Sequence, residues 1–280
     1  MRYAELMQPA VTDTFQRTVL DYYRAHGRHD LPWRTPEADG SFNPYKILVS
    51  EIMLQQTQVP RVLPKFAEFL GLFPTFASLA AAPLADVIKA WSGLGYNRRA
   101  KFLWQAAQAV TEQYHGQLPD SQAALVALPG IGVNTAGAVM AYAFNKPVVF
   151  IETNIRTVYI HHFFADATAV HDRDISDMVA ATVPDNAREW YWALMDYGTH
   201  LKQTVGNASR NSAHYSRQSA FAGSRRQLRG SVLRALHDGG KTAAELHVLL
   251  TDERLDGVLA DLVQESFIEL RSGRYILHGS

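Results

Sequence analysis

The segment LPGIGVNTAGAVMAYAF, residues 128–144, places a glycine-containing turn directly before an apolar helix. Gly130 and Gly132 permit a tight turn whose backbone N–H groups are not covered by side chains. These groups precede a helix expected at 134–144, and the positive end of a helix dipole favours an anion. A short helix expected at 121–127, capped by Asp120 or Ser121, comes before the turn. The segment therefore predicts two helices joined by a phosphate-holding turn, although a plain helix–helix turn fits the same residues.

Helical periodicity continues on both sides of this segment, with almost no alternating strand pattern before residue 200, so the predicted fold class is mainly α. Residues 204–223, rich in Ser, Asn, Gly and Ala, resemble a linker. The expected helices, besides the one that carries Glu51, are 12–26, 61–72, 75–81, 84–92, 97–115, 121–127, 134–144, 154–165, 172–182 and 186–203.

The last sixty residues show a different pattern. Helices are expected at 226–237, 242–250 and 252–265, followed by the short strands SFIEL and RYILH with a Ser-Gly turn. Three helices and a hairpin predict a winged helix-turn-helix, and a small helical cap with a hairpin is the alternative. The predicted domains are therefore 1–222 and 223–280.

Composition excludes several classes of protein. The 280 residues include no cysteine, which excludes disulfides, thiolate metal sites and iron–sulfur clusters. No apolar run approaches the roughly 18 residues of a membrane helix, and the N-terminus lacks a signal-peptide layout, so we expect a cytoplasmic protein. The net charge is zero, but no acid occurs from Tyr197 to Leu236, where seven basic residues lie. That stretch suits contact with a phosphate backbone, or a solvated linker.

Two acids stand out by their surroundings. Glu51 has Ile47, Leu48 and Leu54 three or four positions away on its helix, and an apolar setting raises the pKa of a carboxyl. Glu152 precedes a helix start at Thr153 or Asn154, whose positive end would keep its carboxylate ionised. Two acids with pKa values pushed apart are the pattern for cleaving a glycosidic bond. An exposed helix edge and an ordinary helix-start acid are the alternatives.

The order of the motifs LPWR, NPYKILVSEIMLQQTQV, WSGLGYNRRA, LPGIGVNTAGAV, ETNIRTV and ALMDYGTHL resembles the helix-hairpin-helix (HhH-GPD) DNA glycosylases, most closely the MutY-type adenine glycosylases. The resemblance covers about residues 14–203. It implies a two-module helical glycosylase fold, with the winged-helix-like domain following it.

The resemblance also assigns roles. Glu51 matches the acid that protonates the purine, and Glu152 takes the place of an aspartate that stabilises the sugar cation. The pocket for the extruded adenine is implied for Trp33, Arg34 and Asp196. Entry into the duplex and contact with the opposing base are implied for Gln56, Thr57, Leu94 and Tyr96. Further DNA contacts are expected from Gln55, Arg98, Gly130, Ile131, Gly132 and Asn154, and from Arg271 and Arg274 in the wing.

The sequence departs from the family pattern in four respects. Glu152 is longer than the aspartate by one methylene. The four cluster cysteines of relatives fall near Lys202, Ser209, Ser212 and Gln218, so no iron–sulfur cofactor is expected, and the loop must be held by packing or hydrogen bonds or be mobile. The C-terminus lacks a Nudix-like pattern. Asn134 replaces the lysine of strand-cutting relatives and cannot form a Schiff base.

These features together predict a monofunctional DNA glycosylase that removes a mispaired base, with adenine opposite 8-oxoguanine or guanine as the preferred substrate. We expect it to act as a monomer on double-stranded DNA, associated with the nucleoid and not with a membrane. A potassium or sodium ion on the hairpin carbonyls is compatible with the sequence, and no metal-ligating residues are expected. Thymine or uracil removal from mismatches with guanine, and lesion binding without catalysis, are the alternatives.

Overall fold

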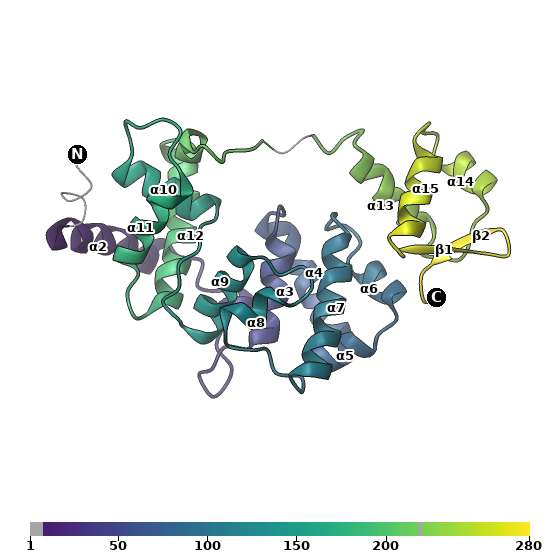
Figure 1. Ribbon diagram of the computed structural model, residues 1–280, viewed down its shortest axis with the longest axis horizontal. Coiled ribbons are helices and arrows are strands. Elements are labelled where there is room, and N and C mark those ends of the chain that lie inside the picture. Colours follow the sequence, from purple (N-terminus) through teal and green to yellow (C-terminus); the bar gives the residue numbers. More distant parts are fainter. Residues whose placement is uncertain (1–7, 218–219) are drawn as a thin grey trace. The chain divides into compact units, whose positions relative to one another are not determined.

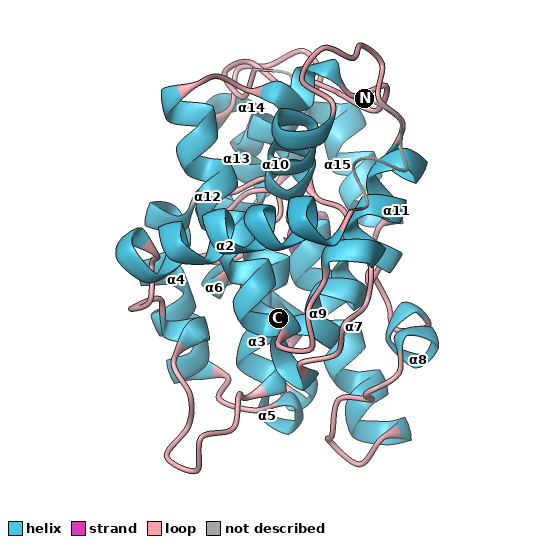
Figure 2. Cartoon of the chain, turned by 90° about the vertical axis from the view of Figure 1, so that its left-hand side faces the viewer, coloured by secondary structure: helices cyan, strands magenta, loops and turns pink. Residues whose placement is uncertain are grey.

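The computed structural model describes residues 8–217 and 220–280, and it is mainly helical, as predicted (Figures 1 and 2). The helices before residue 217 are α2 (Pro9–His26), α3 (Pro44–Leu54), α4 (Val59–Leu72), α5 (Phe76–Ala81), α6 (Leu84–Ala90), α7 (Arg98–Gln113), α8 (Gln122–Val126), α9 (Val133–Phe144), α10 (Thr153–Phe163), α11 (Asp172–Thr182) and α12 (Ala187–Thr204), with the 3-10 turns η1 (Pro32–Arg34) and η2 (Ala208–Asn211). Each predicted helix is confirmed within about three residues of its expected ends, and Ser121 caps α8.

The described chain divides into two compact units. Unit 1 contains the residues up to Glu51, Asp120–Ala127 and Ile131–Arg217. Unit 2 contains Ile52–Pro119, Leu128–Gly130 and the described residues that follow Arg217. The predicted boundary near residue 222 is not tested by this division and stays a prediction.

Helix α12 lies at the centre of unit 1, where it packs against α2, α9 and α10. Its side chains Trp190, Tyr191 and Leu194 are fully buried, and Phe15 of α2 meets Trp190 edge-on at 5.5 Å between ring centroids. Burying aromatic rings of this size gives several kcal/mol of hydrophobic stabilisation. These aromatic side chains of α12 therefore form part of the core of unit 1, against which α10 packs.

Unit 2 is built on α7, which packs against α5 and α6 around the buried side chains of Trp91, Leu103 and Phe69. It also contains α13 (Arg225–Ala235), α14 (Ala243–Leu249), α15 (Leu255–Gln264) and the antiparallel strands β1 (Ile268–Arg271) and β2 (Arg274–Leu277). Ser272 and Gly273 have φ values of 52° and 75°, which a tight two-residue hairpin turn requires. The three helices and the hairpin are therefore confirmed, whereas a winged-helix role stays a prediction.

The segment expected to be a linker is partly ordered. Asn207 caps η2 by accepting a hydrogen bond from the Ser209 backbone, and η2 packs against α10. The Val170 N–H donates to the Asn211 carbonyl at 2.9 Å, and the Ala213 N–H donates to the Val170 carbonyl at 2.9 Å. Of the two states left open for this loop, held by hydrogen bonds or mobile, residues 207–213 show the first, through specific hydrogen bonds that periodicity does not reveal.

No helix within residues 8–217 and 220–280 combines the length and the apolar character needed to span a bilayer.

Candidate active site

Glu51 lies on α3 near the buried side chains of Ile47 and Leu48, as its spacing predicted. Burial in this apolar setting raises the pKa of Glu51 to about 8, and the nearby negative charge of Glu152 adds to the rise. The charge of Arg34 opposes it. Glu51 therefore holds a proton near neutral pH, which a general acid requires.

Glu152 is the N-cap of α10 and lies in unit 1 with Glu51. Its Oε1 accepts hydrogen bonds from the backbone N–H groups of Asn154 at 2.6 Å and Ile155 at 3.0 Å. Both contacts and the helix dipole favour the ionised carboxylate. Burial outweighs them and raises the pKa of Glu152 overall, although the positive charge of Lys202 and the two backbone contacts lower it.

The two acids differ in what surrounds them. Glu152 has two N–H donors, a helix N-terminus and the charge of Lys202, whereas apolar side chains surround Glu51. Tyr142, buried on α9, feels the charges of both acids, and its pKa is raised well above the ordinary value by burial. It therefore stays neutral. The arrangement provides a proton donor in Glu51 and, in Glu152, a carboxyl whose hydrogen bonds and neighbouring cation favour the charged form.

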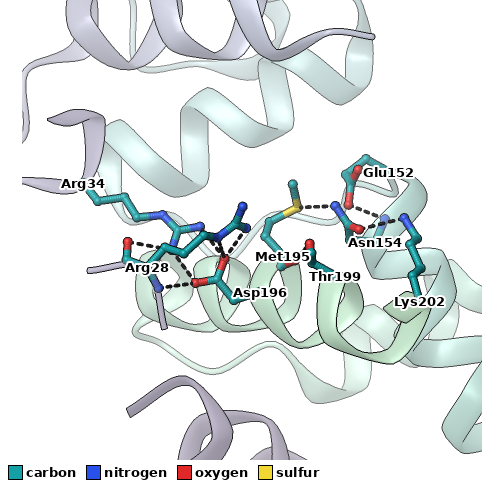
Figure 3. A network of polar contacts seen from close by, with 8 residues as sticks. All are labelled: Arg28, Arg34, Glu152, Asn154, Met195, Asp196, Thr199 and Lys202. Atoms are coloured by element: carbon teal, nitrogen blue, oxygen red, sulfur yellow. Dashed lines mark hydrogen bonds and ion pairs between the residues drawn. The ribbon is translucent and has the colours of Figure 1, made fainter. Parts of the chain in front are cut away.

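The predicted base-pocket residues are buried in unit 1. Trp33 is 6% exposed, Arg34 is 7% exposed and Asp196 is 4% exposed. The guanidinium of Arg34 donates two hydrogen bonds of 2.8 and 3.0 Å to the Asp196 carboxylate. The backbone N–H and the guanidinium of Arg28 donate to the same carboxylate (Figure 3). Burial tends to raise the pKa of Asp196, but both arginines together hold it below its ordinary value.

Asp196 thus has its oxygens occupied, whereas the Nε of Arg34 is buried without a partner among the described residues. A buried donor without an acceptor destabilises the folded protein. Proteins keep such a donor at sites where a bound ligand provides the acceptor. The guanidinium carbon of Arg34 also lies 5.5 Å from the ring centroid of Trp192 and 5.9 Å from that of Tyr23. Arg34 is therefore held in place but retains one free donor.

The glycine turn has the predicted form. Gly130 has a φ of 74°, and a Cβ there would lie 2.4 Å from the Cβ of Phe102, so only glycine fits. Gly132 is the N-cap of α9, which therefore begins without a side-chain cap, and Ile131 is buried. Asn134 is exposed on the first turn of α9. Its Oδ1 accepts a long 3.5 Å hydrogen bond from the Ile151 N–H, next to Glu152.

Two turns in unit 2 carry the residues expected to enter the duplex. Gln56 and Tyr96 have φ values of 55° and 49°, a region that bulky residues rarely occupy. Gln56 is exposed, Gln55, Thr57 and Tyr96 are partly exposed, and Leu94 is only 3% exposed. In this conformation Leu94 is a core residue, so its entry into DNA would require the turn to move.

Arg99 is a structural residue of these turns that sequence reasoning missed. Its guanidinium donates to the carbonyls of Ile52, Met53 and Gln55 in the first turn and to those of Leu94 and Gly95 in the second. Burial lowers the pKa of Arg99 to about 10. Two arginines are adjacent in the chain, and only packing distinguishes buried Arg99 from exposed Arg98.

The remaining predicted DNA contacts are engaged in the structure. Arg98 pairs with Glu265 at 2.6 Å. Arg271 pairs with Glu269 at 2.8 Å and Arg274 with Glu245 at 3.2 Å. The Asn154 side chain lies inside unit 1, where it accepts a hydrogen bond from Lys202 at 2.7 Å. The DNA contacts assigned to these four residues stay predictions.

Comparison with known proteins gives consistent matches. A family model described as the HhH-GPD superfamily of base excision DNA repair proteins matches residues 49–177. The adenine DNA glycosylase of Mycolicibacterium smegmatis is 36% identical over 290 residues, covering 93% of this chain and 95% of that protein. The adenine DNA glycosylase of Buchnera aphidicola subsp. Baizongia pistaciae is 40% identical over 192 residues, covering 67% of this chain and 52% of that protein.

The solved structure of a thermostable thymine-DNA glycosylase matches with a TM-score of 0.59 and 27% identity, covering 67% of this chain and 85% of that one. A helical fold with a glycine turn before α9, a proton-holding acid and a capped acid defines the class of helix-hairpin-helix base-excision proteins. The chain belongs to the HhH-GPD superfamily of base excision DNA repair proteins. It spans about half the length of the Buchnera relative and nearly all of the mycolicibacterial one.

Proposed function

We propose that this protein is an adenine DNA glycosylase, which hydrolyses the N-glycosidic bond of a mispaired adenine in double-stranded DNA. The observation that carries the proposal is the pair of unlike acids in unit 1, with the pKa of Glu51 raised to about 8 and Glu152 accepting two backbone hydrogen bonds. The mycolicibacterial relative, similar over 93% of the chain, is an adenine DNA glycosylase. That similarity supports adenine over thymine.

The geometry supports a direct mechanism. The extruded base accepts a proton from Glu51 on a ring nitrogen, so the electron pair of the breaking bond leaves with a neutral base. Positive charge then develops on the sugar, and the Glu152 carboxylate stabilises it. A water molecule adds to the sugar carbon and loses a proton, which leaves an abasic site. The first step uses Glu51 in the protonated state that burial favours, and the second uses the Glu152 carboxylate that its two backbone hydrogen bonds and Lys202 stabilise.

The proposal includes a monofunctional reaction. The resemblance places Asn134 where strand-cutting relatives carry a lysine, and an amide nitrogen is not nucleophilic enough to attack the sugar. Its side chain contacts the backbone next to Glu152. Strand cleavage should therefore appear only after alkali treatment, and borohydride should trap no covalent complex with DNA.

The proposal extends to where and how the protein works. Its substrate would be chromosomal DNA in the cytoplasm. We also propose that it acts as a monomer and needs no iron–sulfur cofactor, since the chain has no cysteine to hold one.

The test is a panel of single-lesion duplexes containing A:8-oxoguanine, A:G, T:G and U:G, heated in alkali after single-turnover incubation. We expect cleavage at adenine, and Glu51→Gln should reduce it by roughly 10²–10⁴-fold with DNA affinity nearly unchanged. Glu112→Gln, which changes an exposed acid on α7, should behave as wild type. Products only from T:G or U:G would favour the pyrimidine alternative, and binding without any product would favour a non-catalytic protein.

A further inference from the structure

Lys202 on α12 points toward the first turn of α10, where Glu152 lies (Figure 3). Its Nζ donates a 2.7 Å hydrogen bond to Asn154 Oδ1, and the Asn154 backbone N–H donates to Glu152 Oε1 at 2.6 Å. One residue, Asn154, therefore contacts both the ammonium and the carboxylate. These contacts hold the Lys202 ammonium in one place near the Glu152 carboxylate.

Gly198, one turn before Lys202, makes this approach feasible. A Cβ at position 198 would lie 2.6 Å from the Asn154 carbonyl oxygen and 2.8 Å from the Asn154 Cβ, which is closer than real contacts allow. Helices approach this closely only where a glycine removes the side chain. The short α10–α12 distance brings the Lys202 side chain to Glu152.

The other groups near Glu152 act on it less strongly or are uncharged. Arg156 makes two hydrogen bonds of 2.9 and 2.8 Å with Asp172, and its charge lowers the pKa of Glu152 less than the charge of Lys202 does. Glu51 holds a proton, and Tyr142 is neutral. Lys202 is partly buried, and among the described residues it forms no direct ion pair. An ammonium that has lost part of its hydration is stabilised by a nearby anion, and Glu152 is the anion whose charge acts on it.

We propose that Lys202 is a positioning residue that keeps the Glu152 carboxylate ionised beside the sugar. The role rests on the proposed function, and it falls on a position where the resemblance implies a cluster cysteine in relatives. The charge of Lys202 is the largest influence lowering the pKa of Glu152, which burial raises. Lys202 thus provides a cation at a position where the resemblance implies a cysteine thiolate in relatives.

The test compares Lys202→Met, which removes the charge at similar length, with Lys202→Arg, which keeps it. Single-turnover adenine release is measured against pH, where the acid limb reports Glu152 and the alkaline limb reports Glu51. We expect Lys202→Met to move the acid limb upward by about one pH unit, because a charge at this range shifts a pKa by that order. Lys202→Arg should restore it. Lys146→Met, which removes an exposed lysine from the same unit, is the matched control.

A second readout does not depend on activity. The Glu152 side-chain carbon is titrated by ¹³C NMR, assigned by its disappearance in Glu152→Gln, in the wild type and in Lys202→Met. A higher pKa in Lys202→Met supports the proposal even if no adenine is released, an outcome that would overturn only the proposed function. An unchanged Glu152 pKa, or a rate lost equally at every pH without rescue by arginine, would overturn the role of Lys202.

Discussion

Replacing Glu51 by glutamine should stabilise the protein, and increasingly so as the pH rises. The pKa of Glu51 is raised from 4.5 to about 8 in the folded state. A carboxyl with a raised folded pKa gives full stability below its unfolded pKa, and that stability is lost as pH rises through the folded pKa. A tenfold difference in proton affinity between the folded and unfolded chains corresponds to about 1.4 kcal/mol, so the carboxyl costs roughly 3 kcal/mol of stability at neutral pH.

Glutamine has nearly the same shape and does not ionise, so the variant avoids that cost. Unfolding by urea, followed by tryptophan fluorescence, gives the free energy of unfolding of wild type and variant at each pH. The difference should be small near pH 5 and should widen by roughly 3 kcal/mol by pH 8. Glu112→Gln, at an exposed position of α7, should show no such widening.

A constant difference between the two proteins across this pH range would refute the reasoning, since it would mean that Glu51 ionises as freely in the folded chain as in the unfolded one. A variant less stable than the wild type at high pH would show instead that the carboxylate is structural. We expect the variant to be more stable and to lose base release. Such a result is typical of a site where catalysis needs an acid in an environment that destabilises its charged form.

Two further perturbations test how the site is held. Arg99→Met should destabilise the protein by roughly 1–3 kcal/mol, measured by urea unfolding, because carbonyls in two turns lose a buried donor. If these turns contact DNA as expected, the variant should also bind undamaged duplex more weakly in a gel-shift titration, and an unchanged affinity would argue against that contact. Gly198→Ala should push α12 away from Asn154, at a cost of about 1–3 kcal/mol, and should reduce base release more than DNA affinity. Equal losses of rate and affinity would contradict that geometry.

The sequence identified the chemical elements of unit 1 because they have local signals. Glu51 lies among apolar residues at helical spacing, and Glu152 directly precedes a helix start, so burial and the cap could be predicted without coordinates. The glycine turn was predictable for the same reason. Local periodicity also indicated the helices, whose observed ends lie within about three residues of the expected ones.

Long-range pairing had no such signal. Arg99 satisfies carbonyls more than forty positions away, and Arg28 reaches Asp196 across 168 positions. Nothing in composition or spacing marks these arginines as different from exposed ones. The same limit explains why the sequence left residues 207–213 open between a held and a mobile loop, where hydrogen bonds to Val170 order a segment whose composition is that of a loop. Sequence patterns report which face a residue occupies, but not which distant partner it meets.

The cysteine-free segment after α12 is held by packing and by neutral hydrogen bonds. Ser209 and Ser212, at two of the positions expected for cysteines, are 1% and 7% exposed, so they pack as small core residues and not as a mobile loop. Asn207 accepts hydrogen bonds from the Ser209 backbone at 3.2 Å and from its hydroxyl at 2.6 Å. Because neutral hydrogen bonds hold this segment, Lys202 at a third such position is free to carry charge toward Glu152. On the resemblance, a cluster would need that position as a ligand, so a charged Lys202 and a metal cluster are alternative uses of the same position.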